Sequence, residues 1–225
     1  MVERSGVKVD FSFLESYGEE FYDGLWTTIS VSLLALIFSL ILGTVIAVFR
    51  ISGVRLLEGF GTAYVEFIRN TPLVAQIFFV FFALPAVGIK FSQFMVGTIG
   101  LSIYTSSYIA EVIRAGIQSV PRGQMEAARS SGLTYIQAMT HVILPQAFKL
   151  IIPPLGNQFI NLVKNSSVLA VIAGGELMYF TDQATTESDV TPVYLFVAVV
   201  YLVLTIPLSL LVNYLERRWM KKEAR

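Results

Sequence analysis

The sequence predicts an all-α integral membrane protein with five transmembrane helices. Of its 225 residues, 55% are apolar and 14% are charged, whereas charged residues make up about 25% of a typical soluble domain. Mean hydropathy is +0.68. The charged residues also leave long gaps, and about 20 apolar residues are enough to cross a hydrocarbon core of ~30 Å. These observations place the chain in a bilayer.

The charge gaps locate the spans in order along the chain. No charged residue occurs between Asp23 and Arg50 or between Asp189 and Glu216, so these gaps hold the two clearest helices. Two more gaps follow each other in the middle of the chain, and a later apolar run is interrupted only by Lys164. The predicted spans are 24–49, 60–84, 92–114, 150–175 and 191–215.

The distribution of lysine and arginine predicts the orientation, because cytoplasmic loops are enriched in these residues. Twelve of the 16 basic residues fall on one side of the spans, and acidic residues dominate the other side. The twelve are Arg50, Arg55, Arg69, Arg114, Arg122, Arg129, Lys149, Arg217, Arg218, Lys221, Lys222 and Arg225. The chain then divides into an extracytoplasmic amphipathic segment (1–23), a transmembrane domain (24–216) and a basic cytoplasmic tail (217–225).

The amino-terminal segment lacks a basic region followed by an apolar stretch, so its first 22 residues do not look like a cleaved signal. Apolar and aromatic residues recur there among acidic ones, which suits a helix lying on the outer surface with its rings at the lipid headgroups. They are Phe11, Phe13, Leu14, Tyr17, Phe21, Tyr22 and Leu25. A partly ordered tail is the alternative interpretation.

The loop over residues 119–146 carries a regularly spaced motif. It reads Glu126-Ala127-Ala128, three residues, Gly132, nine residues, and then Val142-Ile143-Leu144-Pro145. Residues 124–139 contain few helix breakers besides Gly132, so they favour a short surface helix, and Pro145 starts the next element. A chance helical tripeptide is the alternative, but matches at several fixed offsets in a cytoplasmic loop favour a docking surface for another protein.

This motif resembles the EAA loop of ABC importer membrane subunits. Six residues match the family pattern, namely Glu126, Ala127, Ala128, Gly132, Leu144 and Pro145, and Val142 stands where the family prefers isoleucine. The resemblance implies a type I ABC importer permease fold with a cytoplasmic coupling helix. It also implies a dimer of ABC ATPase subunits as partner, which would hold ATP and Mg, and leaves no cofactor in this chain.

A second segment, residues 64–73, is similar to the Glu-x-x-Arg-Gly-Thr-Pro-Leu signature of polar amino acid permeases, with Asn70 in place of the glycine. Together the two motifs extend the resemblance over roughly residues 20–215. It implies a bacterial inner-membrane location, an extracytoplasmic amino-acid-binding protein, and pairing with a second copy of this chain or with a paralogue. Lipid and an amino acid substrate complete the expected partners, and no nucleic acid is expected.

The second span contains a helix break at Asn70-Thr71-Pro72, because Pro72 lacks an N–H and clashes with the preceding turn. Broken helices at membrane depth line cavities in many transporters. Glu66 and Arg69 precede this break, and deep charges usually face a polar cavity or each other. Glu66 and Thr71 are therefore candidate substrate-binding residues, and a structural Glu66–Arg69 pair at i and i+3 is the alternative.

Polar residues recur on one face of the fourth span, where Asn157, Asn161 and Asn165 are four positions apart and Gln158 lies beside them. Side-chain amides can donate to a carboxylate and accept from an ammonium group, although they also join helices in membranes. Thr105 and Tyr108 of the third span extend the candidate cavity, with packing as their alternative role. The candidate substrate-binding residues are thus Glu66, Thr71, Thr105, Tyr108, Gln158, Asn161 and Asn165.

Several function classes are excluded or disfavoured. The sequence has no cysteine, one histidine (His141) and no P-loop, so thiol chemistry, paired-histidine zinc sites and ATP binding by this chain are not expected. The expected protein is a transporter subunit and not an enzyme. A proton-coupled secondary transporter that uses Glu66 is the runner-up. Glu66 and the acidic outer loops favour a cationic substrate such as arginine, lysine or histidine, although Glu66 could equally bind an α-amino group.

Overall fold

The computed structural model describes residues 10–220, and the regular elements of this range are all helical. Residues 1–9 and 221–225 lie outside the described residues, and with them part of the amphipathic segment and most of the basic tail that the sequence predicts. In chain order the elements are α1 (Phe13–Ile51), α2 (Arg55–Arg69), α3 (Leu73–Ala86), α4 (Gln93–Gln118), α5 (Arg122–Ser130), α6 (Tyr135–Ala138), the π-helical η1 (Met139–Ile143), α7 (Leu144–Asn165), the 3₁₀-helical η2 (Ser166–Ile172), α8 (Leu177–Ala184) and α9 (Val190–Met220).

Within residues 10–220, two helices are long and apolar enough to cross a membrane by themselves, namely α1 and the 190–218 part of α9. The pair α2 and α3 meets the same test together but is bent by 101° at residues 70–72. Helices α4 and α7 have 26 and 22 residues, which is sufficient length, but their sequences are more polar. The count of five spans therefore stays a prediction, whereas the break in the second predicted span is present.

The amino-terminal segment is not a separate element from Phe13 onward, because it forms the first turns of α1. The rings of Phe13 and Phe21 are buried and pack edge-to-face on Phe196 of α9, with centroids 5.8 and 5.2 Å away. Phe13 and Phe21 thus pack against a neighbouring helix, and a surface position for the rest of the segment 1–23 stays a prediction. The aromatic pattern reflects contact with another helix for these two residues.

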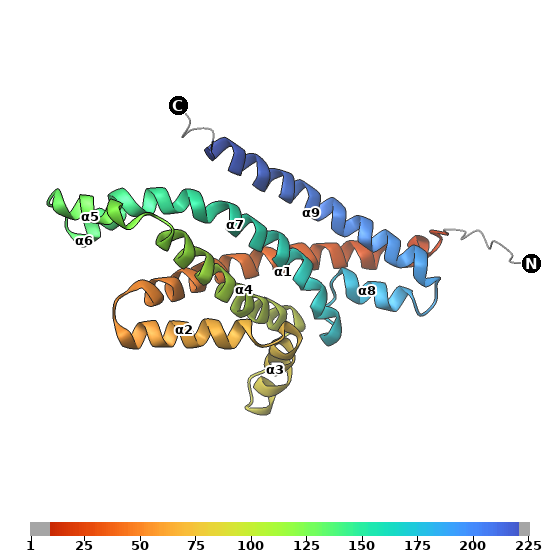
Figure 1. Ribbon diagram of the computed structural model, residues 1–225. Helices are drawn as coiled ribbons and strands as arrows, with labels where there is room; N and C mark the ends of the chain where they lie inside the picture. The colour runs from red at the N-terminus through yellow and green to blue at the C-terminus, as the bar shows by residue number, and fades with distance from the viewer. Residues whose placement is uncertain (1–9, 221–225) are drawn as a thin grey trace, which may run out of the picture.

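Helix α1 packs lengthwise against α4, and a glycine permits the close approach. A Cβ atom added to Gly43 would lie 2.7 Å from the side chain of Ile109 and 2.8 Å from the carbonyl oxygen of Ser106. Small residues at such crossings let helix backbones approach each other in membrane proteins. The α1–α4 pair is the most extensive helix–helix contact of the described residues, and other helices pack around it (Figure 1).

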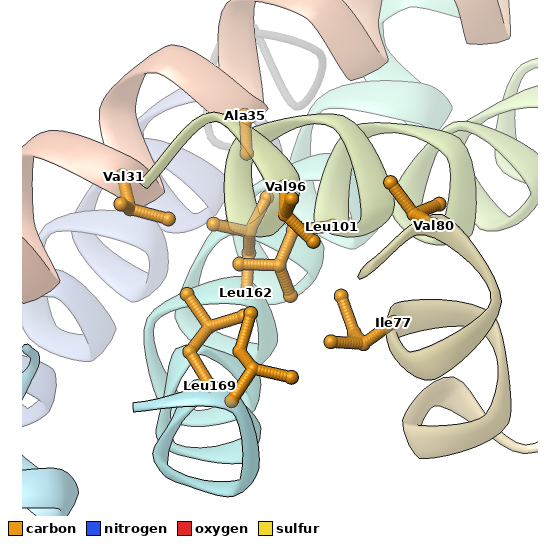
Figure 2. Close-up of a cluster of buried hydrophobic side chains, with 9 residues drawn as sticks. Val31, Ala35, Ile77, Val80, Val96, Leu101, Leu162 and Leu169 are labelled. Atoms are coloured by element: carbon orange, nitrogen blue, oxygen red, sulfur yellow. The ribbon is translucent and has the colours of Figure 1, made fainter. Parts of the chain in front are cut away.

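The main apolar core lies where α1, α3, α4, α7 and η2 meet (Figure 2). Its buried members are Val31, Ala35, Ile77, Val80, Val96, Leu101, Leu162, Leu169 and Ile172. A Cβ atom on Gly100 of α4 would overlap the side chain of Ile77, so α3 stays in close contact with α4 despite the sharp bend that precedes it. This core holds α4 and α7 in place from one side.

The end of α7 differs from the predicted span 150–175. The regular helix ends at Asn165, and a 3₁₀-helix follows up to Ile172. The hydroxyl groups of Ser166 and Ser167 donate to the carbonyls of Val163 and Lys164, a local hydrogen-bond pattern that competes with regular helix geometry. Ala173 and Gly175 then adopt positive φ angles of 55° and 65°, which reverses the chain.

Helix α8 follows this reversal and is capped by a buried carboxylate. The two oxygens of Glu176 accept from the backbone N–H groups of Met178 and Tyr179, at 2.8 and 2.9 Å, and Tyr201 of α9 donates to the same carboxylate at 3.2 Å. The two backbone bonds satisfy free N–H groups of the first turn. The Tyr201 bond joins α8 to α9 at the end of the bundle that lies opposite α5 and α6 (Figure 1).

The predicted surface helix over 124–139 is interrupted. Gly132 adopts a φ of 88° and ends α5, and its amide donates to the carbonyl of Arg129 at 3.1 Å. Glycine is favoured in this left-handed conformation because it has no Cβ atom. The chain continues through α6 and η1 into α7, where Pro145 stands in the first turn, as the sequence predicts.

Candidate functional site

A polar cavity of about 220 Å³ lies between α4 and α7. Five of the seven candidate substrate-binding residues line it, together with Tyr104. Helix α4 contributes Tyr104, Thr105 and Tyr108, and α7 contributes Gln158, Asn161 and Asn165. We call this space the substrate cavity after the candidate residues that line it, and substrate binding there stays a prediction.

Helix geometry explains why these residues converge. Residues three, four or seven positions apart share a helix face, so Gln158, Asn161 and Asn165 form one stripe along α7. Tyr104 and Tyr108 form the matching stripe on α4, and α4 and α7 pack against each other. Asn157, which continues the four-residue repeat in the sequence, is exposed and does not line the cavity.

The lining offers hydrogen bonds without charge. Its side chains are three amides, two phenols and one hydroxyl, and none of the lining residues within the described part of the chain is charged. Each amide has an acceptor oxygen and a donor NH₂ group, and each hydroxyl can donate or accept. The cavity can therefore bind a small polar or zwitterionic molecule from several directions.

Tyr104 was not among the sequence candidates. Its hydroxyl lies 3.0 Å from the hydroxyl of Tyr108, and the two rings have centroids 5.0 Å apart. The available signal was its position one turn before Tyr108 on the same face of the span. The tyrosine pair forms the α4 wall of the substrate cavity.

Glu66 and Thr71 lie outside this cavity, at the bend between α2 and α3. The Glu66 carboxylate accepts from the side-chain amide of Asn70 at 3.1 Å, and the Thr71 hydroxyl donates to the carbonyl of Phe67 at 2.7 Å. Within the described residues, Glu66 and Arg69 form no ion pair. Both candidates belong to a hydrogen-bonded turn, and a role of theirs in substrate binding stays a prediction.

The bend is closed by side chains that satisfy the last carbonyls of α2. The Asn70 amide donates to the carbonyl of Glu66 at 2.8 Å, and the Gln76 amide donates to the carbonyl of Ile68 at 2.8 Å. Gln76 also reaches the carbonyl of Thr71 at 3.1 Å. A helix terminus leaves such carbonyls without partners inside the helix. We call residues 66–76, with these bonds, the elbow.

A second cavity, of about 460 Å³, adjoins the substrate cavity, and its lining residues lie further along α4 and nearer the start of α7. Tyr108 and Gln158 line both spaces. Arg69, the last residue of α2, lines the second cavity, and its guanidinium carbon lies 5.1 Å from the centre of the Tyr108 ring. This distance is in the range of a cation–π interaction.

A charge network closes the same region toward α1. Glu111 of α4 pairs with Arg50 of α1 and with Arg114 one turn further along α4, and Arg114 also donates to Gln118. Arg50 is largely buried, with 9% of its side chain exposed. A buried charge needs such a partner, and removing the partner is strongly destabilising. The network ties α1 to α4 near the α5–α6 end.

The motif of the loop 119–146 is presented at that end (Figure 1). Glu126 and Ala127 are exposed on α5, Ala128 faces inward, and Gly132 forms the turn that follows. Leu144 and Pro145 begin α7. Tyr135 and Ile136 are 53% and 73% exposed, so apolar side chains stand beside the motif without cover in this chain. Docking of an ATPase here stays a prediction.

Most of the chain is similar to known proteins. The family described as "Binding-protein-dependent transport system inner membrane component" matches residues 35–221. Two relatives come from Bacillus subtilis (strain 168). The "Probable glutamine ABC transporter permease protein GlnM" is 58% identical over 202 residues, covering 89% of this chain and 94% of that protein. The "L-cystine transport system permease protein TcyB" is 38% identical over 197 residues, covering 87% and 84%.

Solved structures agree with the fold. A chain from an "amino acid ABC transporter with histidines" superposes with a TM-score of 0.87 at 38% identity and covers 94% of this chain and 99% of that one. A chain of the inward-facing MetNI methionine ABC transporter has a TM-score of 0.77 at 21% identity, covering 91% and 98%, and it supports the fold alone. The helices therefore have the type I ABC permease arrangement. The chain belongs to the family of inner membrane components of binding-protein-dependent transport systems, and it is a permease subunit, not an enzyme.

Proposed function

We propose that this permease carries a neutral polar amino acid, with glutamine as the first candidate, through an ATP-driven importer. The observation that supports this most directly is the uncharged lining of the substrate cavity, which consists of three amides, two phenols and one hydroxyl. The amide oxygens can accept from the α-ammonium group of a substrate. The amide NH₂ and hydroxyl groups can donate to its carboxylate.

The same lining argues against a cationic side chain. An arginine or lysine substrate would leave a second positive charge in the cavity, and burying a charge without a counter-charge is costly. The sequence-based preference for cationic amino acids depended on Glu66 and on the acidic outer loops, and Glu66 is exposed and bonded to Asn70 at the elbow. A terminal amide, in contrast, can exchange paired hydrogen bonds with Gln158, Asn161 or Asn165.

The relatives are named for different amino acids, with glutamine named more often than cystine. The relative that is 58% identical is named as a probable glutamine permease, and a second B. subtilis protein with that description is 37% identical over 214 residues. The superposed structure is described as an amino acid ABC transporter with histidines, and another relative is named for cystine. We therefore take glutamine as the first substrate to test.

In the complete importer, two permease chains would enclose the pathway in the bacterial inner membrane. We expect five spans per chain, the amino terminus outside and the α5–α6 end in the cytoplasm, in accord with the basic residues there. The exposed motif residues would dock on a dimer of ATPase subunits, which hold ATP and Mg, and an extracytoplasmic binding protein would deliver the amino acid. The permease contributes differential affinity between inward- and outward-facing states.

A proton-coupled secondary transporter is not favoured. Its proposed proton site, Glu66, does not line the substrate cavity, and the family consists of components of binding-protein-dependent systems. Transport that requires a proton gradient and no ATP would reverse this choice.

The test is uptake and binding by the purified importer. With ATP inside proteoliposomes and the binding protein outside, labelled glutamine should accumulate, and excess unlabelled glutamine should compete better than arginine or histidine. Asn161→Ala should weaken glutamine affinity roughly two- to tenfold, the range for one neutral hydrogen bond. Asn157→Ala is the matched control, because Asn157 lies on the same helix outside the cavity, and its affinity should equal wild type. Stronger competition by arginine than by glutamine would overturn the proposal.

A further inference from the structure

The substrate cavity and the second cavity lie in series along the same two helices. The first is lined from Tyr104 to Tyr108 on α4, and the second from Tyr108 to Ser119. On α7 the order is opposite, since the first cavity uses residues 158–165 and the second uses residues 150–158. Both directions lead toward α5 and α6. The second cavity therefore lies between the substrate cavity and the α5–α6 end, which we call the coupling end.

We propose that the ring of Tyr108 is an inner closure between these two cavities and that Arg69 is the positioning residue that holds it. Tyr108 is one of only two described residues that line both spaces. Its ring is contacted on the second-cavity side by the Arg69 guanidinium, 5.1 Å from the ring centre. Its hydroxyl is tied to Tyr104, 3.0 Å away, on the substrate side. The ring is thus held from both cavities.

The charge of Arg69 is directed at this ring and not at an acid. Within residues 10–220, Arg69 takes part in no ion pair, and Glu111, the acid among the described residues that line the same cavity, is already paired with Arg50 and Arg114. A cation over a tyrosine face is attracted by the ring quadrupole. The contact therefore restrains the ring without fixing it as firmly as a buried ion pair would.

The position of Arg69 links this closure to the bend in the chain. Arg69 is the last residue of α2, and the 101° elbow begins directly after it. Asn70, Thr71 and Gln76 bond the terminal carbonyls of α2, so the direction of this helix end depends on the elbow. A change at the elbow would displace the guanidinium from the ring and open the substrate cavity toward the coupling end.

The first test does not depend on the identity of the substrate. The permease chain has no cysteine, so Asn161→Cys gives each permease chain a single thiol, in the substrate cavity, and Ser119→Cys gives it one in the second cavity. The rate of reaction with a small methanethiosulfonate reagent, added from the coupling side to the detergent-purified complete importer, is then measured with and without Arg69→Met. Arg69→Met should raise the rate at Asn161→Cys roughly two- to fivefold, the factor expected for loss of a partly exposed cation–π contact.

Three controls define the result. Ser119→Cys should react equally fast in both backgrounds. Arg69→Lys, which keeps a cation, should give a smaller increase than Arg69→Met. Arg55→Met, at the exposed start of the same helix, should have no effect. Equal rates at Asn161→Cys with and without Arg69→Met, or an equal increase at Ser119→Cys, would overturn the closure.

A second test builds on the proposed glutamine site. A closure changes how fast a ligand enters and leaves, whereas a binding contact changes its affinity. Arg69→Met should therefore raise the association and dissociation rates of labelled glutamine together, with Kd within about twofold of wild type. A weaker Kd at an unchanged association rate would make Arg69 a substrate contact and end the proposal. Absence of glutamine binding in the wild type would contradict the proposed substrate and leave the thiol test standing.

Discussion

The side-chain amide of Asn70 donates to both the carbonyl oxygen and the carboxylate of Glu66, at 2.8 and 3.1 Å. Asn70 stands where polar amino acid permeases have glycine in the matching signature. Its backbone φ of −90° and ψ of 0° do not require glycine, because φ is negative. The substitution thus supplies a capping group for α2. It explains why the Glu66 carboxylate is bonded within the local turn.

The first prediction concerns this cap. Asn70→Gly should lower the free energy of unfolding by about 1 kcal/mol, because two carbonyl or carboxylate acceptors lose their donor. Thermal unfolding of the purified importer in detergent measures the effect.

Glu66→Gln should leave glutamine affinity within about twofold, since Glu66 does not line the substrate cavity. A tenfold weaker affinity would restore Glu66 as a substrate ligand.

The second prediction concerns the α1–α4 crossing. Gly43→Ala should destabilise the chain by about 1 to 3 kcal/mol, because its Cβ atom would lie 2.8 Å from the backbone oxygen of Ser106 and the helices would have to separate. Gly59→Ala is the control, since a Cβ atom there meets nothing within 4 Å. That substitution should be neutral or stabilising by up to about 1 kcal/mol. Equal melting temperatures for the two variants would contradict the close crossing.

The third prediction concerns the coupling turn. Gly132→Asp should abolish association with the ATPase subunits, because φ is 88° and the new side chain would stand in the exposed motif. Gly132→Asn provides the comparison, since asparagine tolerates this left-handed conformation best among residues with a side chain. It should assemble better than Gly132→Asp. Co-purification with the ATPase reports the result, and glutamine binding should survive in both variants; normal assembly of Gly132→Asp would refute the docking assignment.

The fourth prediction concerns topology. A cysteine at Ser188, in the turn between α8 and α9, should react with an impermeant thiol reagent added to intact cells. A cysteine at Ser131, beside α5, should react only after permeabilisation. The native chain contains no cysteine to confuse the signal. The reverse pattern would show that the orientation derived from basic residues is wrong.

The sequence predicted the amide stripe of α7 in part, because Asn161 and Asn165 of the four-residue repeat line the cavity with Gln158, whereas Asn157 does not. It also predicted the break at Pro72, which follows from backbone chemistry. It could not show where the neighbouring side chains point once the helix is broken. Glu66 was therefore expected in the cavity, whereas Arg69, three residues later, is the side chain that reaches Tyr108.

Two further features of the fold were not predicted from hydrophobic periodicity. The end of α7 at Asn165 depends on hydroxyl groups that bond backwards along the helix, and apolar composition gave no sign of it. The continuous α1 was divided in the prediction because acidic residues interrupt its apolar run. In the structure Phe13 and Phe21 find partners on α9, which extends the helix beyond the charge gap.

That continuity gives α1 a mechanical role. The helix has 39 residues, rises ~58 Å and contains no proline, so it is a stiff rod. Near one end Phe21 is wedged against α9, and near the other Arg50 is anchored to Glu111. Along α1 there is no proline hinge that could absorb a tilt imposed at the end beside α5 and α6. We expect such a tilt to be carried along the helix to the end beside α8, so that the two ends of the molecule move together.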